Sequence, residues 1–506
     1  MSDDSSRESD SRINTWLLLF VSVGIILRLL RYFLDMPVWG DEAALAINIL
    51  NHGYSALRRP LDYLQVAPIG FLWSERAMYG HFGMSEWSMR FLPMLAGIGS
   101  LVLFAWWARL MATPLAAAIA VGILAVGNYS VRYAVEMKPY GYDLLAAILL
   151  LLPATLFLLR RQNRWLLCLL VVTPIALILS YPAVFVAGGV GLALMLNVRT
   201  MSKLQIALCA FLGLEMIGAF WLLVWGVGQA QYHYTQTGMA ADWQNAFPPA
   251  NPLRFIWWFI LIHTGNMFEY PFGGANGASA GSFLVFLFGL AVWLPKRRRE
   301  LVCLILAPFA LNFVAAVLHR YPYGGSARVA QALAPAIILM IGVGAAGLID
   351  RFIGEPRQRL LARRSVFAGL LIFGAAVGAD MALHPYKSRD DAQARSVIRN
   401  LFRRAGPSDI IAVLMPRAQV HVTLQWYLRE HDQRITWDAA VNRSWQNFSG
   451  PIWVLNLKPS PGIQKRLEGK LHRPATFVER YVATHDLQTI PLRYWELFGF
   501  AAKSAG

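Results

Sequence analysis

Long apolar segments separated by short polar loops dominate the first 383 residues of the chain. Many approach the length of about 20 apolar residues that an α-helix needs to cross a bilayer. The pattern predicts about 11 membrane spans. They lie at residues 15–34, 89–110, 114–130, 140–159, 165–180, 183–197, 204–227, 279–294, 301–318, 329–349 and 366–383.

One further apolar segment, LRFIWWFILIH at residues 253–263, is too short to cross a bilayer comfortably. A helix of this length rises only about 16 Å, against a hydrocarbon core about 30 Å thick. Counting it as a span would also move the later KRRR loop to the opposite side of the membrane. We therefore interpret it as an interfacial or re-entrant helix.

Basic residues collect in alternate loops, at 160–164, 199–203, 296–299 and 351–364. With the predicted spans, all of these loops share one side of the membrane with the N-terminus. The positive-inside rule makes that side cytoplasmic. Residues 1–14 are then a cytoplasmic tail and residues 15–383 a transmembrane domain. The opposite side receives four segments, at 35–88, 130–139, 228–278 and 319–328.

From residue 384 the long apolar segments give way to shorter patterns. DIIAVLMP and GPIWVLNL are typical of buried strands, and DDAQARSVIRNLFRRAG is typical of an amphipathic helix that ends at glycine. Residues 384–506 are predicted to form a small extracytoplasmic α/β domain. The fold class is therefore an α-helical polytopic membrane protein with a C-terminal α/β domain.

Composition agrees with a membrane protein. Of the 506 residues, 57% are hydrophobic and only 15% are charged, whereas soluble proteins carry about 25% charged residues. The formal net charge of +17 would indicate nucleic acid in a soluble chain. Here basic loops beside anionic lipid explain it, so the expected partner is the bilayer and not nucleic acid.

The terminus and the cysteines add two further expectations. The first residues, MSDDSSRESDSR, lack the basic segment of a signal peptide, so we expect the first apolar segment to be retained as a span. The 3 cysteines all lie within apolar segments. We therefore expect neither disulfides nor a cysteine metal site.

Unusual polar residues gather in the loops predicted to face outward. Asp41 and Glu42 open the first loop, directly after a predicted span. Pro139 marks the expected start of a helix, and the basic and acidic residues just before it suit an anion near a helix N-terminus. The other candidates are Asp62, Tyr63 and Gln65 in the first loop, Arg132, Glu136, Lys138 and Tyr140 in the second, and Tyr321 and Arg328 in the fourth.

Each of these residues also has an ordinary interpretation. Asp41 and Glu42 are favourable near the start of any helix. Lys138 and Glu136 could pair with each other, and Arg328 could anchor a span at the membrane surface. Their coincidence on one side favours chemistry. A carboxylate can take a proton from an acceptor hydroxyl, and cations can stabilise a leaving phosphate.

Three motifs carry a resemblance to a known family. VWGDEAALAINIL with PLDYLQVAPIGFLWSERAMYG, RYAVEMKPYGYDLL, and HRYPYGGSARVAQALAP resemble elements of C-type (GT-C) membrane glycosyltransferases. The branch is that of the bacterial relatives of protein O-mannosyltransferase and of the lipid A aminoarabinose transferase. The resemblance covers most of residues 15–349.

The resemblance implies a sugar transfer from a polyprenyl-phosphate donor to an extracytoplasmic acceptor, with inversion, at the outer face of the bacterial cytoplasmic membrane. Asp41 would be the general base and Glu42 would orient it. Arg132, Lys138 and Arg328 would bind the carrier phosphate beside Tyr140 and Tyr321. Some members of the family use a divalent metal near the acids and others do not. The chain shows no convincing ligand spacing, so we expect no obligatory metal and no other cofactor.

Two other functions are compatible with the pattern. A flippase or transporter of lipid-linked sugars should show charges within spans or paired broken helices. Glu215 is such a charge and Asp380 lies near the end of a span, but the spans otherwise contain few acids. A polysaccharide polymerase or ligase would share the arginine-rich outward loops. The order of the acidic motif and the Glu-x-Lys-Pro-Tyr motif favours the glycosyltransferase.

Overall fold

The computed structural model describes residues 2–223, 243–272, 277–413, 422–429, 435–436, 452–457, 485–491 and 495–502. The chain divides into two compact units. The membrane unit comprises Met1–Asp35 and Asn48–Pro385, and the second unit comprises Met36–Ile47 and Tyr386–Gly506.

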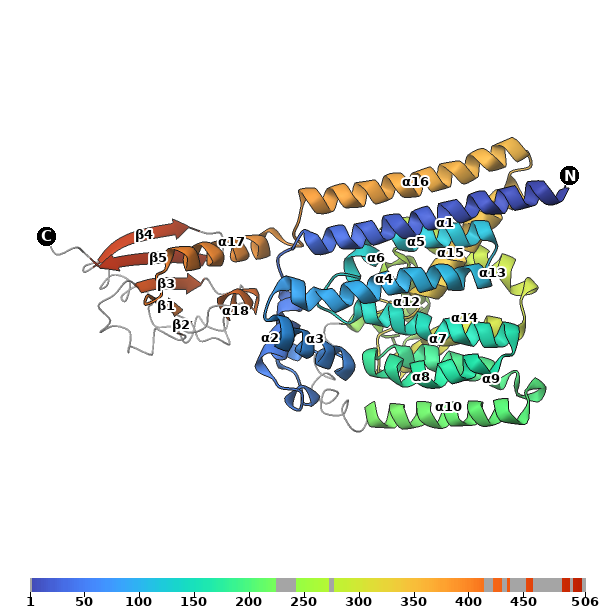
Figure 1. The fold of residues 1–506 in the computed structure, drawn as a ribbon, viewed down its shortest axis with the longest axis horizontal. Coiled ribbons are helices and arrows are strands. Elements are labelled where there is room, and N and C mark those ends of the chain that lie inside the picture. The colour runs from blue at the N-terminus through green and yellow to red at the C-terminus, as the bar shows by residue number, and fades with distance from the viewer. Residues whose placement is uncertain are drawn as a thin grey trace. The chain divides into compact units, whose positions relative to one another are not determined.

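A bundle of long helices forms the membrane unit (Figure 1). A helix coincides with each of the segments predicted to span the membrane. These helices are α1 (Ser2–Phe33), α4 (Glu86–Met111), α5 (Pro114–Val126), α7 (Tyr140–Arg160), α8 (Asn163–Leu179), α9 (Ala183–Met195), α10 (Lys203–Trp221), α13 (Gly277–Trp293), α14 (Arg299–Val317), α15 (Ala334–Phe352) and α16 (Pro356–Leu383). In the described residues, 8 helices are long and apolar enough to cross a membrane, while α5, α8 and α9 are shorter apolar helices.

Short helices lie in the first three of the four segments predicted to face outward, and the four are here named the first to fourth outward loops. That these loops face outward stays a prediction. The short helices are α2 (Gly40–Asn51), α3 (Ile69–Phe82), α6 (Asn128–Tyr133) and α12 (Pro252–Thr264), with 3₁₀ turns η1 (Ala56–Arg58), η2 (Asp62–Leu64), η5 (Gln244–Ala246) and η6 (Asn266–Phe268). Two more 3₁₀ turns, η3 (Val198–Thr200) and η7 (Leu294–Lys296), lie in basic loops. The helix predicted at 253–263 is present as α12, where the side chain of Asn251 accepts hydrogen bonds from the first backbone N–H groups. Its interfacial position stays a prediction.

Small residues let the inner helices of the membrane unit approach closely. A Cβ added to Gly342 of α15 would lie 2.6 Å from the carbonyl oxygen of Ala116 in α5. A Cβ on Gly344 would lie 2.0 Å from the carbonyl oxygen of Val285 in α13. No larger residue fits at these crossings without moving a backbone. The α5–α13–α15 contact is therefore fixed by glycine.

One arginine is fully buried within the membrane unit. Arg28 of α1 donates hydrogen bonds to the carbonyl oxygens of Leu124 at 3.1 Å and of Ala125 at 3.3 Å. Those carbonyls lie in the last turn of α5, where no further helical N–H group is available to them. A cation there also complements the negative end of the helix dipole. Arg28 thus holds the end of α5, from which the second outward loop begins.

The second unit contains a mixed sheet with helices α17 (Arg389–Arg404) and α18 (Val422–Arg429). Its strands are β1 (Ile410–Val413), β2 (Ile435–Thr436), β3 (Ile452–Leu457), β4 (His485–Pro491) and β5 (Trp495–Ala502), in the order β2-β1-β3-β5-β4. The strand β1 runs parallel to β2 and β3, and β5 runs antiparallel to β3 and β4. The α/β fold expected of the tail, with its amphipathic helix and two strands, is confirmed. Its placement outside the cytoplasm stays a prediction.

Candidate active site

Lys138 and Gln65 join the first two outward loops. The Lys138 ammonium (Nζ) donates to the side-chain oxygen of Gln65 at 2.7 Å, and Lys138 is only 5% exposed. Pro139 takes the N-cap position of α7, as the sequence predicted, so Lys138 directly precedes this helix start. The Gln65 amide also donates to the carbonyl oxygen of Tyr63 at 3.2 Å. A cation is therefore held in a fixed position near a helix N-terminus.

An ion pair lies beside this lysine in the chain. The Arg132 Nε donates to Glu136 Oε1 at 2.7 Å, and Glu136 is 1% exposed. Burial works to lower the pKa of Arg132, but the charge and hydrogen bond of Glu136, with the nearby tyrosines, together outweigh that effect and raise it. The second carboxylate oxygen of Glu136 is buried, and no described residue forms a hydrogen bond with it. Buried polar atoms nearly always have a partner, so this oxygen is suited to a donor group of a ligand.

Aromatic rings surround the ion pair. The ring centroid of Tyr133 lies 5.2 Å from that of Tyr140 and 5.4 Å from that of Tyr129. Burial, and then the charge of Glu136, raises the pKa of Tyr133. The Tyr133 hydroxyl forms a hydrogen bond with Ser326, which connects the second outward loop to the fourth.

The sequence did not single out Tyr133, Glu269 or Tyr270 as site residues. Glu269 is buried and hydrogen bonds with Tyr129, whereas Gln331 donates to the Tyr270 hydroxyl at 3.3 Å. The available signal was an acid within the aromatic segment GNMFEYPF at residues 265–272. This segment lies far along the chain from the loop that it contacts.

A second group of buried carboxyls lies where α3 meets α7. Glu75 of α3 is fully buried, and the hydroxyl of Tyr142 donates to its Oε1 at 3.5 Å. Burial raises the pKa of Glu75 well above its usual range. Asp143, in the first turn of α7, hydrogen bonds with Ser180.

Tyr321 and Arg328, from the fourth outward loop, have different surroundings. Tyr321 packs against Phe185 and donates to the carbonyl oxygen of Val329 at 3.2 Å. Burial, and then the nearby charge of Asp143, raises the pKa of Tyr321 well above its usual range. The Arg328 guanidinium stacks on Trp243, 4.8 Å from the ring centroid. Tyr321 therefore belongs with the α3–α7 carboxyls, and Arg328 with an aromatic residue of the third outward segment.

Asp62 and Tyr63 lie in the η2 turn of the first loop. The backbone N–H of Asp62 donates to the side-chain oxygen of Asn48 at 2.7 Å, and the Asn48 amide donates back to the Asp62 carbonyl oxygen at 3.1 Å. Tyr63 has a positive φ of 59°, a conformation uncommon outside glycine. Asn48 thus ties the last turn of α2 to the η2 turn that carries these two candidates.

Asp41 and Glu42 lie in the first turn of α2, within the part of that helix that belongs to the second unit. Glu42 is 1% exposed, and its Oε2 accepts a hydrogen bond from the backbone N–H of Trp39 at 3.5 Å. The neighbouring Val38 N–H donates to the Tyr427 hydroxyl at 2.8 Å, and Lys387 stacks on the Trp39 ring. The helix start that carries both acids is therefore anchored to the α/β tail.

Over the described part of the chain, no group of three or more histidine, cysteine, aspartate or glutamate side chains could hold a metal ion. The expectation of no obligatory metal stays a prediction.

Comparison with known proteins identifies the fold. No protein-family model matches the chain. No curated protein sequence matches it either. The crystal structure of apo ArnT from Cupriavidus metallidurans is similar with a TM-score of 0.54 at 14% identity, covering 96% of this chain and 98% of ArnT. The structure of the same protein bound to undecaprenyl phosphate is similar with a TM-score of 0.52 at 14% identity, covering 97% of this chain and 98% of ArnT. The chain therefore has an ArnT-like fold.

Proposed function

We propose that this protein is an integral membrane glycosyltransferase that moves a sugar from a polyprenyl-phosphate donor to an extracytoplasmic acceptor. The observation that carries the proposal is a fixed pair of cations in the second outward loop of an ArnT-like fold. Lys138 donates to Gln65 of the first loop, and Arg132 pairs with Glu136. Undecaprenyl phosphate is bound in one of the similar structures, which supports a donor of this class.

In the proposed reaction, an acceptor hydroxyl oxygen attacks the anomeric carbon of the donor sugar. The bond between that carbon and the phosphate oxygen breaks, and the polyprenyl phosphate leaves with the bonding electrons. Attack opposite to the leaving group inverts the anomeric centre. The hydroxyl proton passes to Asp41, the general base.

Lys138, Arg132 and Arg328 supply positive charge for the leaving phosphate. The developing negative charge is stabilised best by donors that are already in place before the reaction. Lys138 and Arg132 meet this condition, because each is already hydrogen-bonded to a side chain of the site. In the proposal, Tyr140 and Tyr321 flank the phosphate.

The remaining candidates position the sugar and the acceptor. Glu42 orients Asp41, since both lie in the first turn of α2. Glu136 keeps one buried carboxylate oxygen for a sugar hydroxyl. Asp62, Tyr63 and Gln65 form the side of the site contributed by the first loop. The proposed location is the outer face of the bacterial cytoplasmic membrane, and acceptors of the expected class are cell-envelope glycans, lipids or proteins.

The test uses purified protein in liposomes with radiolabelled polyprenyl-phosphate sugars and an envelope extract as acceptor. The Asp41→Asn variant should lower turnover by about 100-fold or more, the usual scale for losing a general base, while donor binding is retained. The matched control is Asp380→Asn, because Asp380 has a 75% exposed side chain at the end of α16. It should transfer label at the wild-type rate.

Two results would overturn parts of the proposal. Label that crosses the bilayer on its carrier, equally in wild type and Asp41→Asn, identifies a flippase. Full activity of Asp41→Asn combined with loss in Glu42→Gln moves the base to Glu42.

A further inference from the structure

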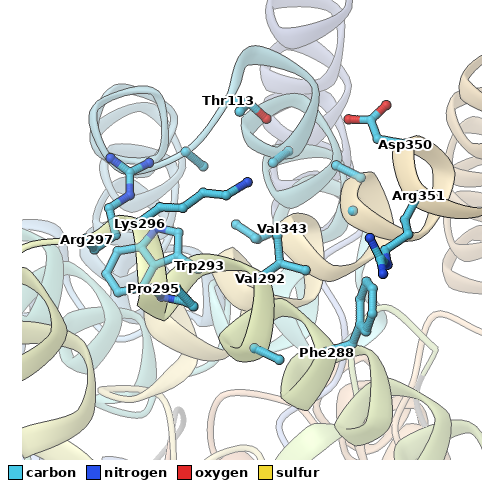
Figure 2. Close-up of a pocket in the computed structure, with 15 residues that line it drawn as sticks. Thr113, Phe288, Val292, Trp293, Pro295, Lys296, Arg297, Val343, Asp350 and Arg351 are labelled. Carbon is cyan, nitrogen blue, oxygen red and sulfur yellow. The ribbon is translucent and has the colours of Figure 1, made fainter.

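A cavity of about 730 Å³ lies at the opposite end of the membrane unit from the candidate active site. It is formed where α5 begins and where α13 and α15 end (Figure 2). The helix α15 separates it from Arg328, and a helix of 19 residues rises about 28 Å. The cavity therefore belongs to neither the proposed donor site nor the proposed acceptor site.

Away from its rim, this cavity is lined by apolar side chains. Phe288 and Val292 line it from α13, and Val343 lines it from α15. The glycine-mediated contacts of α15 with α5 and α13 lie directly beside these residues. Because those contacts hold the three backbones together, the cavity is a preformed space between membrane helices.

The rim of the cavity is basic. Figure 2 shows Lys296 reaching over the cavity from one side and Arg351 on the side across from it. Both side chains are exposed, and the described residues give neither an ion-pair partner. Arg297 already has a hydrogen-bond partner, since it donates to the carbonyl oxygen of Met111 at 2.7 Å. Thr113 contributes a hydroxyl group.

One acid also lines the rim. Asp350 Oδ1 lies 3.1 Å from the Arg363 guanidinium, which offsets its charge. Lys296, Arg297 and Arg351 therefore leave the rim with a positive balance at the level where the membrane helices end.

We propose that this cavity, defined by Lys296, Arg297, Arg351 and Thr113 above Phe288, Val292 and Val343, binds the phosphate headgroup of an anionic phospholipid. Charge complementarity places the phosphate between Lys296 and Arg351. The apolar walls continue into the helix bundle, so they suit acyl chains and not a soluble anion. Basic pockets between transmembrane helices are typical binding places for anionic lipid headgroups.

The test measures thermal unfolding of the detergent-solubilised full chain during titration with phosphatidylglycerol. Wild type should be stabilised with saturation, because a ligand that binds the folded state raises its stability. Each basic residue near an anionic lipid surface is worth about fivefold in affinity. The Lys296→Gln/Arg351→Gln variant should therefore need roughly 30-fold more lipid.

The matched control is Arg357→Gln/Arg364→Gln, which removes the same charge from exposed positions of α16 outside the cavity. It should titrate like wild type. Equal weakening in both double variants would show general attraction to basic loops and would overturn the proposal. An unchanged cavity variant would overturn it as well.

Two further arms separate the sources of phosphate. Phosphatidylcholine and inorganic phosphate should each fail to stabilise wild type at the same concentrations. Stabilisation by inorganic phosphate alone would identify a soluble anion and overturn the lipid assignment. If the double variant loses its cooperative unfolding transition, the Ala291→Trp variant provides the test. Ala291 lines the cavity, and the larger side chain would fill it without changing the charge. This variant should abolish the lipid effect, and an unchanged effect would overturn the proposal.

Discussion

The charged residues at the two ends of the membrane unit differ in burial and in pairing. In the outward loops the Arg132–Glu136 pair is 2.7 Å long with a buried carboxylate, and Lys138 is buried on Gln65. At the basic end Lys296 and Arg351 are exposed, and Asp350 pairs with Arg363 at the surface.

This difference distinguishes two kinds of charged residue: those that orient the chain in the membrane, and those that belong to a binding or catalytic site. Exposed basic residues orient the chain in the membrane and need no fixed partner. Buried charges carry a large desolvation cost unless they are paired and hydrogen-bonded. Orientation in the membrane therefore does not explain the buried charges of Arg132, Glu136 and Lys138. The proposed binding of the donor phosphate does explain them.

The largest expected contrast compares two lysines. Lys138→Met should lower turnover by about 100-fold, since loss of one preorganised donor to a developing anion costs 100-fold or more. Lys203→Met removes the same charge from an exposed position at the start of α10 and should leave turnover unchanged. Initial rates at saturating donor measure both. Equal losses in the two variants would contradict the assignment of Lys138 to the reaction.

The next contrast compares two ion pairs. Arg132→Ala should lower the free energy of unfolding by about 3 kcal/mol, because Glu136 is left as a buried, unpaired charge. Adding Glu136→Gln should recover part of this loss. Chemical unfolding in detergent measures the three proteins. A double variant no more stable than Arg132→Ala alone would show that lost packing, and not the unpaired carboxylate, causes the effect.

A third prediction concerns the pH dependence caused by Glu75. Its folded-state pKa is raised by burial, so the folded protein holds this proton more tightly than the unfolded chain does. Stability from the protonated group is present below the ordinary glutamate pKa and is lost as pH rises through the raised folded pKa. Glu75→Gln should therefore flatten the decline of the unfolding midpoint that wild type shows as pH rises above the ordinary glutamate range. The exposed control Glu355→Gln should keep the wild-type slope.

The smallest expected effect belongs to the surface pair at the basic end. The side chain of Asp350 is 54% exposed and that of Arg363 is 30% exposed. Arg363→Ala should lower the free energy of unfolding by no more than about 1 kcal/mol. That effect should shrink in high salt, because exposed pairs are screened. A loss as large as that of Arg132→Ala would remove the distinction between the two ends.

The helices of the membrane unit were predictable because a long apolar segment is a local property of the chain. Pro139 was expected to begin a helix and does so as the N-cap of α7. The segment at 204–227 matches α10 as far as Trp221, and its last residues lie outside those that the structure describes. The division of the chain into two compact units was harder to predict from the sequence. The acids of α2 fall in the second unit, together with residues from 386 onward.

The candidate site was predictable in residue types but not in partners. Unusual charges beside spans drew attention to Arg132, Glu136 and Lys138. Nothing local indicates that Lys138 meets Gln65, because the two residues are 73 positions apart. Tyr133 and Glu269 were missed for the same reason: their roles arise from contacts between distant loops. The catalytic roles of the predicted residues stay predictions.

The buried Arg28 has a consequence for how the protein is made. Its carbonyl partners in α5 lie 96 and 97 residues later in the chain. When α1 first enters the membrane, these partners have not yet been synthesised. An arginine at the centre of a membrane helix costs about 2.5–3.5 kcal/mol on insertion scales, and Arg28, which lies off centre in the span Ile13–Phe33, carries a smaller cost of the same kind. We therefore expect α1 to settle fully only after α5 has been synthesised, so that the order of synthesis is part of how this bundle assembles.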